Sequence, residues 1–136
     1  MKKEIEIPQA IIDAIIRQAR DELPDEACGL LAGIDTVVKK RFPLENTDHS
    51  PEHFSFDPRE QFRVLKEARS EGLRILANYH SHPSTPARPS DEDIRLAYDP
   101  DILYLIASLA SEPPVVRAFA RNVEGGMTPV EIKIGW

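Results

Sequence analysis

Two histidines, a serine and an aspartate follow one short apolar stretch of this chain, and their spacing suits metal chemistry. Residues 73–79 are mostly apolar and favour a strand, and His80 and His82 come directly after them. Because side chains two apart on a strand point to the same side, both imidazoles can face one point. Asp93 would lie in the first turn of a helix that begins at Ser90. These residues therefore predict a site for a metal ion.

The segment that joins the second histidine to the serine contains three prolines, which stiffen it because proline fixes φ. Two imidazoles and one carboxylate suit zinc, and three protein ligands leave a fourth position open, as in catalytic zinc sites. We therefore expect one zinc ion per chain, held by His80, His82 and Asp93. Solvated loop histidines are the alternative. The Ser90–Asp93 pair also fits a capping box, which would hold the aspartate still and is compatible with a metal site.

A glutamate is the second candidate of interest, because a catalytic zinc needs a base that takes a proton from water. Glu26 stands at the start of an apolar, glycine-containing stretch, 26–33, that predicts a buried strand. Its alternative is an exposed residue at a strand end. Cys28 lies two residues further on and would face the same pocket. Such a cysteine is most often a small buried hydrophobe, and a metal or redox role for it is left open.

Composition narrows the function classes. The 136 residues fit a single domain, 1–136, with one core. A net charge of −6 argues against a nucleic-acid surface, and no apolar run approaches the length of a membrane span. The only cysteine cannot form an intrachain disulfide, and the first seven residues lack the apolar core of a secretory signal. We therefore expect a cytoplasmic protein with neither nucleic acid nor membrane as a partner.

The hydrophobic pattern predicts strands mixed with three helices, which indicates an α/β or α+β sheet with helices packed on it. The polar stretch 45–52 is expected to be a surface loop. Strands are expected at 3–7, 26–33, 36–44, 53–57, 73–79, 102–109, 115–121 and 130–134, and helices at 8–22, from 58 to a stop at 72, and 90–98.

The candidate residues together resemble the motif of the JAMM metallopeptidases, the catalytically competent branch of the MPN domains. That motif is an upstream glutamate, then His-x-His-Pro, and a Ser-x-x-Asp whose aspartate follows the second histidine after ten intervening residues. Here Glu26, His80, His82, Ser90 and Asp93 match it with nothing missing. The order of expected strands and helices extends the resemblance over essentially the whole chain.

The resemblance implies a cytidine-deaminase-like MPN fold with a central mixed β-sheet flanked by helices. It implies hydrolysis of the peptide or isopeptide bond that follows the C-terminal Gly-Gly of a ubiquitin-like or sulfur-carrier protein. In that reaction Glu26 would accept a proton and pass it to the leaving amine, and Ser90 would help to stabilise the oxyanion. The stretches 24–31 and 56–58 look like the compact bacterial and archaeal members. A homodimer is left open.

Two alternatives share parts of this pattern. A non-catalytic MPN scaffold would bind partners without chemistry, but such domains usually lack the metal ligands. A RadC-like, DNA-associated protein has a similar motif, and the negative charge and missing DNA-binding domain count against it. A zinc deaminase is excluded because it needs a Cys-x-x-Cys pair. The chain has no long insertion after Asp93, which argues against linkage-specific deubiquitination.

Overall fold

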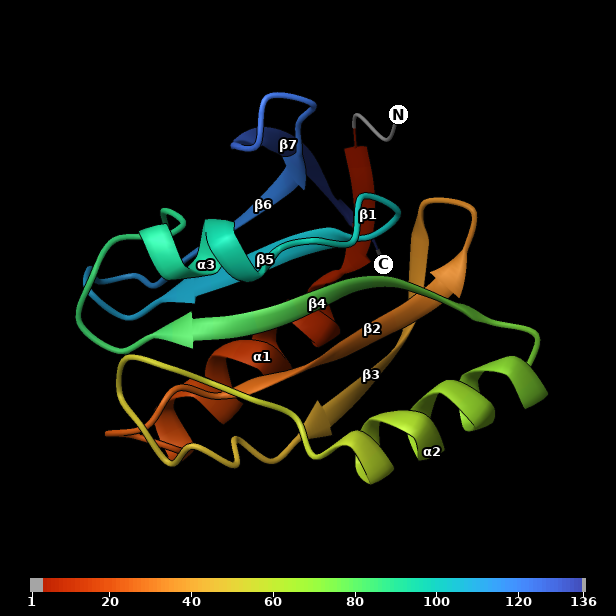
Figure 1. Ribbon diagram of the computed structural model, residues 1–136, viewed down its shortest axis with the longest axis horizontal. Helices are drawn as coiled ribbons and strands as arrows, with labels where there is room; N and C mark the ends of the chain where they lie inside the picture. Colours follow the sequence, from red (N-terminus) through yellow and green to blue (C-terminus); the bar gives the residue numbers. More distant parts are fainter. Residues whose placement is uncertain (1–3, 136) are drawn as a thin grey trace.

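Seven strands and three helices form the structure of residues 4–135, the part of the chain that the computed structural model describes (Figure 1). Within this range no helix is both long and apolar enough to cross a membrane. The elements are β1 (Glu4–Pro8), α1 (Gln9–Asp21), β2 (Cys28–Ile34), β3 (Val37–Leu44), α2 (Pro58–Ser70), β4 (Arg74–His82), α3 (Asp91–Leu96), β5 (Leu103–Ser108), β6 (Val115–Arg121) and β7 (Met127–Gly135).

The strands form a closed barrel in the order β1-β3-β2-β4-β5-β6-β7, with β7 returning to β1. β1 pairs in parallel with both β3 and β7, and β4 pairs in parallel with β5, whereas the other neighbours are antiparallel. The predicted mixed sheet with helices is therefore confirmed. Its closure into a barrel, which joins the first strand to the last, did not follow from the sequence pattern.

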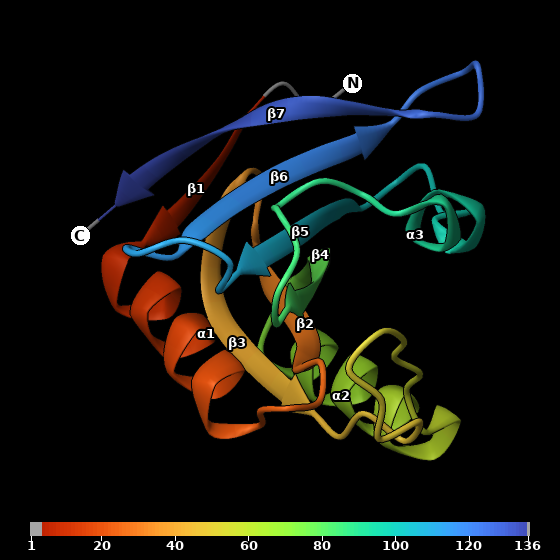
Figure 2. The same cartoon turned by 90° about the vertical axis from the view of Figure 1, so that its left-hand side faces the viewer.

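The barrel places α1 and α2 against opposite faces of β2 (Figures 1 and 2). On one side Ile12 and Ile15 of α1 pack with Leu31, together with apolar residues of β1, β4 and β5. On the other side Val64 of α2 packs with Leu30 and neighbouring apolar side chains. Because both faces of β2 are covered, its residues form a nearly continuous apolar run, as the sequence predicted.

β4 is the strand that carries the site, and it lies between β2, which pairs with residues 74–80, and β5, which pairs with residues 77–82. It is longer than predicted, because pairing with β5 continues to His82, which lies opposite Ser108. Both histidines are therefore inside the strand rather than after it. A central strand is held from both sides, so the two imidazoles project from a rigid backbone.

Residues 45–57, here called the 45–57 loop, connect β3 to α2 across the C-terminal end of β4. The predicted strand at 53–57 is wrong, because this segment belongs to no ladder. Its backbone is instead held by Asn46 and Thr47 of the same loop. The loop ends at Asp57, which accepts a hydrogen bond from the Arg59 N–H and so caps α2, with Pro58 in its first turn.

Candidate metal centre

His80 and His82 bring their Nε2 atoms to 3.2 Å from each other at the C-terminal end of β4. Both side chains are nearly completely buried. Ser81, between them, serves the scaffold instead: its Oγ accepts from Ala27 N at 2.8 Å, and its N–H donates to Ala27 O. Because side chains alternate along a strand, His80 and His82 point to one side of β4 and Ser81 points to the other, where it bonds Ala27.

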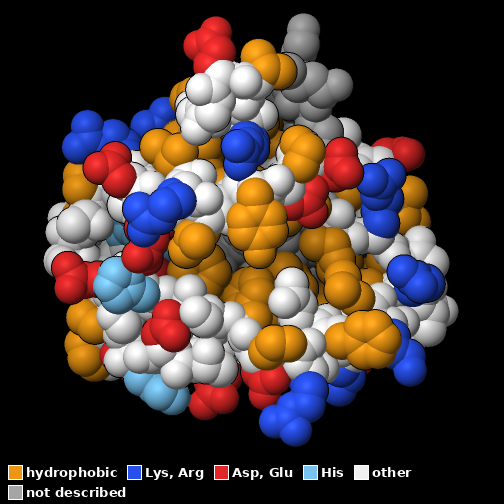
Figure 3. All heavy atoms as spheres, in the orientation of Figure 1, with side chains coloured by type: hydrophobic (Ala, Val, Ile, Leu, Met, Phe, Trp, Pro, Cys, Tyr) orange, Lys and Arg blue, Asp and Glu red, His pale blue; other side chains and the backbone are white. Residues whose placement is uncertain are grey.

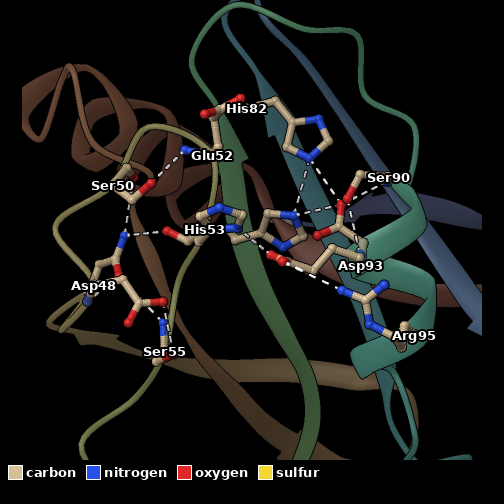
Figure 4. Close-up of polar contacts among 12 residues, drawn as sticks. Asp48, Ser50, Glu52, His53, Ser55, His82, Ser90, Asp93 and Arg95 are labelled. Carbon is tan, nitrogen blue, oxygen red and sulfur yellow. Dashed lines mark hydrogen bonds and ion pairs between the residues drawn. The ribbon is translucent and has the colours of Figure 1, made fainter.

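Asp93 completes the cluster from the first turn of α3 (Figure 4). Its Oδ2 atom lies 3.2 Å from His80 Nε2 and 3.1 Å from His82 Nε2. The predicted capping box is present: Ser90 Oγ accepts from Asp93 N, and Asp93 Oδ2 accepts from Ser90 N. The cap holds the aspartate with its Oδ2 atom toward the imidazoles.

This donor set fits a zinc ion. Zinc bonds of about 2.0–2.2 Å in tetrahedral geometry place neighbouring ligand atoms roughly 3.3–3.5 Å apart. The three observed separations, 3.1–3.2 Å, are close to that spacing. Among residues 4–135 it is the only cluster of three or more such ligands that could hold a metal ion. The prediction that these residues come together is therefore confirmed.

Neighbouring groups orient the two imidazoles. His82 Nδ1 lies 2.8 Å from Pro86 O, and since a carbonyl only accepts, this nitrogen carries a proton, so Nε2 is the ring nitrogen that can bind a metal when it is deprotonated. Phe54 stacks on the His80 ring, with centroids 4.7 Å apart and planes 21° apart. His80 Nδ1 is buried without a hydrogen-bond partner among the described residues.

The cluster attracts both protons and cations. Burial alone would raise the pKa of Asp93, but hydrogen bonds with His80 and His82 and from the Ser90 amide outweigh burial and hold it well below its usual range. Burial would likewise lower the pKa of His82, but Asp93 and the Pro86 carbonyl raise it above its ordinary value. An anionic carboxylate that faces two imidazole nitrogens is the electrostatic environment that a divalent cation requires.

Glu26 lies beside the cluster, as predicted. The β2–β4 ladder ends at the Cys28–His80 pair, and Glu26, two residues before Cys28, is close enough to His82 for the two charges to interact. Its side chain is 4% exposed, and its Oε1 atom has no hydrogen-bond partner in the part of the chain described. Burial raises the pKa of this carboxyl to about 8, although the charge of His82 opposes the change. A buried carboxyl with an unused oxygen is suited to exchange protons.

Cys28 and Ser90 differ in what they offer. The Cys28 thiol shares a face of β2 with the glutamate but lies under Leu44, whose carbonyl it approaches at 3.7 Å. Burial raises its pKa to about 12, so it stays a neutral thiol. The Ser90 hydroxyl is exposed, and its oxygen accepts from Asp93 N. Its O–H has no acceptor among the described residues and is therefore free to donate to a bound molecule.

Three residues of the 45–57 loop belong to the site but were not identified from sequence. Asn46 is buried in a stretch predicted to be a surface loop, and its side chain contacts the backbone of Glu26. Phe54 covers His80. His53 Nδ1 lies 2.5 Å from Glu92 Oε1 in α3. The alternation of Phe54 with polar neighbours is the only signal in the sequence, and such alternation predicts a strand.

Known proteins resemble this chain over most of its length. Residues 8–122 match the family model Prok-JAB, prokaryotic homologs of the JAB domain. The chain is 31% identical over 126 residues to a CysO-cysteine peptidase of Mycobacterium tuberculosis, covering 91% of this chain and 86% of the relative. It is 34% identical over 107 residues to a desampylase of Pyrococcus furiosus, covering 78% and 75% of the two chains.

Solved structures agree with the fold. The solution structure of a Desulfitobacterium hafniense protein has a TM-score of 0.88 and 46% identity, and the match covers 96% of this chain and 92% of that one. A JAB1/MPN domain protein from Archaeoglobus fulgidus has a TM-score of 0.64 at 23% identity, covering 95% and 97%. The second likeness concerns the fold alone and confirms the MPN architecture. By its sequence and its fold, this chain belongs to the Prok-JAB family, the compact prokaryotic branch of the JAMM/MPN domains.

Proposed function

We propose that this chain is a zinc-dependent hydrolase that cleaves the peptide or isopeptide bond after the C-terminal Gly-Gly of a ubiquitin-like or sulfur-carrier protein. The observation that carries the proposal is the triangle of His80, His82 and Asp93 ligand atoms with the buried carboxyl of Glu26 beside it. A binding scaffold has no need of this arrangement. The names of its relatives, a CysO-cysteine peptidase and a desampylase, support the class of reaction and of substrate.

The metal would be held by His80, His82 and Asp93, one ion per chain. When bound, zinc would supply a Lewis acid for the scissile carbonyl and would lower the pKa of a nearby water molecule toward neutrality. Glu26 accepts the proton of the attacking water. Its pKa, raised to about 8 by burial, falls when a cation lies beside it, so the carboxylate form is available near neutral pH.

Two further steps use residues of this chain. Glu26 returns its proton to the leaving amine, which would otherwise depart as an unstable anion. The exposed Ser90 hydroxyl donates a hydrogen bond to the carbonyl oxygen as negative charge develops there, a contribution of about 3 kcal/mol for one such donor. Ser90 does not act as a nucleophile in this proposal, because the histidines near it are committed as ligands and none is free to deprotonate it.

A groove leads from the cluster to the molecular surface and fits an extended tail. Its inner part contains His80 and Asp93, and its outer part continues between the 45–57 loop and the segment after α3. Figure 3 shows hydrophobic side chains gathered across this face around a hollow. The residues common to both parts are Phe54, Asn78, Leu96 and Tyr104. The walls are therefore mostly apolar.

One wall of the groove offers free backbone groups. Ser55 uses its N–H and C=O within the 45–57 loop, bonding Asn46 Oδ1 and Thr47 N. The N–H and C=O of Phe54 and Phe56 have no hydrogen-bond partners among the described residues. Because the strands of residues 4–135 close into a barrel, we propose that the substrate tail pairs with this loop segment as a short added strand.

The body of the carrier would dock where the outer groove opens toward α2. Phe62, 63% exposed, and Leu65, 39% exposed, lie on the outer side of α2, and Tyr98, 77% exposed, lies on the opposite wall. Tyr98 and Gln61 line the outer groove, and Phe62 follows Gln61 along α2, so we propose that a domain whose tail occupies the groove rests on these exposed side chains. Single exposed apolar residues need no explanation, but a group at the mouth of a site indicates a partner.

The proposal is tested with a folded Gly-Gly carrier fused through its C-terminus to one amino acid. Zinc-loaded protein should release that residue, and chelated protein should not. A peptide with the same tail should be cleaved far less efficiently than the folded conjugate, because it lacks the contacts with α2. Phe62→Ser should raise the KM for the conjugate and leave peptide cleavage unchanged, whereas Ile34→Ser, at the end of β2 away from the Cys28–His80 pair, should change neither.

Each outcome has a definite meaning. Absence of cleavage by zinc-loaded protein would refute the proposed activity. Equal kcat/KM for peptide and folded conjugate would refute docking on α2 and make the enzyme a general peptidase for short tails. Replacing the last tail glycine with valine should greatly slow cleavage, because a Cβ obstructs close approach of the backbone to the buried cluster.

A further inference from the structure

We propose that Asn46 is a positioning residue for Glu26: it fastens the 45–57 loop to the backbone of the glutamate and so fixes where the carboxyl meets the substrate. The inference rests on the proposed function. It adds a residue that carries no metal-binding or acid–base chemistry of its own and that no motif of the sequence contains.

Asn46 is 4% exposed, although it lies in a polar loop. Its Nδ2 donates to Glu26 O at 3.0 Å and to His53 O at 2.8 Å, and it lies 3.4 Å from Ser50 O. Its Oδ1 accepts from Asp48 N at 3.0 Å and from Ser55 N at 3.3 Å. One buried amide therefore connects five backbone groups, and both its donor and its acceptor are fully used.

The peptide groups on both sides of Glu26 are held by the loop. The carbonyl of Glu26 accepts from Asn46, and its N–H donates to Ser50 O at 2.8 Å. The carboxyl itself is different, because its Oε1 has no hydrogen-bond partner among the described residues. Glu26 is thus positioned through its backbone, and its side chain is left free to exchange protons.

The other end of the same loop reaches the metal cluster. His53 pairs with Glu92, the neighbour of Asp93 in α3, and Phe54 stacks on His80. Asn46 bonds the His53 carbonyl, so the loop links the base at one end with two proposed ligands at the other. Loss of the Asn46 amide would release Glu26 while β4 and the capping box keep the ligands in place.

Because Asn46 supports Glu26 and other contacts support the proposed ligands, Asn46→Ala should affect catalysis and zinc binding differently. The variant should bind zinc with a Kd within about threefold of wild type, while kcat falls by about tenfold or more because the base is no longer held. KM should rise as well, because Asn46 also holds the His53 and Ser55 backbone of the segment proposed to pair with the tail. In the Glu26→Gln background the same substitution should lower the residual rate no further, since a residue that acts through Glu26 loses its effect when Glu26 is gone.

A matched control separates positioning from general stability. Asn122 also organises a turn through its side chain, with Oδ1 accepting from Glu124 N and Gly126 N, but it lies at the β6–β7 turn. Asn122→Ala should lower the Tm and leave hydrogen exchange of the Glu26 amide unchanged, although the turn that it organises leads to Met127 in the inner groove. Asn46→Ser is the second variant at the loop, because its hydroxyl keeps one short donor and acceptor if the alanine variant does not fold.

A measurement on metal-free protein makes the test independent of turnover. Hydrogen exchange of the Glu26 amide should be faster by about tenfold in Asn46→Ala or Asn46→Ser than in wild type, with little change at β4 amides. Unchanged kcat together with unchanged exchange would overturn the inference, as would loss of zinc in both Asn46 variants. If wild type fails to cleave the conjugate, the proposed function fails, and amide exchange alone decides whether Asn46 holds Glu26.

Discussion

Replacing Glu26 with glutamine should remove the activity of the zinc-loaded protein. The same substitution should make the metal-free protein more stable at alkaline pH. The folded carboxyl has a pKa near 8, raised first of all by burial, whereas the ordinary value is 4.5. Because the pKa is higher in the folded state than in the unfolded state, the protonated carboxyl stabilises the fold. This contribution to the free energy of unfolding is fully present below pH 4.5. That contribution is lost progressively as pH rises through about 8.

The size of the effect follows from this interval. Each pH unit between the two pKa values costs about 1.4 kcal/mol, so the wild-type carboxyl lowers the free energy of unfolding by up to about 5 kcal/mol at pH 8 and above. Glutamine does not titrate. Its amide carries a fixed penalty for its own unpaired groups, but that penalty is the same at every pH and cancels when the pH dependence is compared.

The assay is denaturant unfolding of metal-free wild type and Glu26→Gln at pH 5.5, 6.5, 7.5 and 8.5. The difference in unfolding free energy should grow in favour of the variant by up to about 1.4 kcal/mol per pH unit and level off above pH 8. Glu124→Gln, at an exposed carboxylate, is the matched control and should show no such trend. A difference that stays constant with pH would refute the burial argument for Glu26.

Three further predictions concern the site and its support. Purified protein should hold about one zinc per chain by elemental analysis, and His82→Ala should lose it, because two ligands remain. Ser90→Ala should keep zinc and lower kcat rather than raise KM, and by removing the α3 cap it should cost about 1 kcal/mol in unfolding free energy. Gly29→Ala should cost about 1–3 kcal/mol in denaturant unfolding, because its new Cβ would lie 2.4 Å from the Tyr79 hydroxyl.

The cluster could be predicted because its information is local. His80, His82, Ser90 and Asp93 lie within 14 consecutive positions, and strand alternation with a helix cap is enough to bring them together. Glu26 is distant in sequence, and spacing alone did not place it. Only the family resemblance and the chemical need for a base selected it, and the pairing of Cys28 with His80 brings the start of β2 to the cluster.

The wrong strand at 53–57 and the residues that the sequence did not reveal share a physical cause. The structure around them is decided by contacts that are distant in sequence, or by a single side chain. Phe54 and Phe56 alternate with polar residues because they line a groove, not because the segment is part of a sheet. Asn46 in a polar loop has no pattern that distinguishes it from a solvated residue, although it is buried. The His53–Glu92 contact joins positions 39 apart, and no local periodicity can reveal it.

The pairing of β1 with β7 governs the order in which this chain can fold during synthesis. Ile5 and Ile7 are almost fully buried, yet the strand that closes the barrel beside them ends at Gly135. A nascent chain that has not yet emerged beyond β6 therefore carries two unpaired strand edges and exposed isoleucines, which are the features that promote association with other chains. The pairing of β1 with β7 joins residues far apart in sequence and is therefore a late step of folding. A ribosome-stalled fragment without β7 should depend on chaperones, whereas the chain that includes β7 should not.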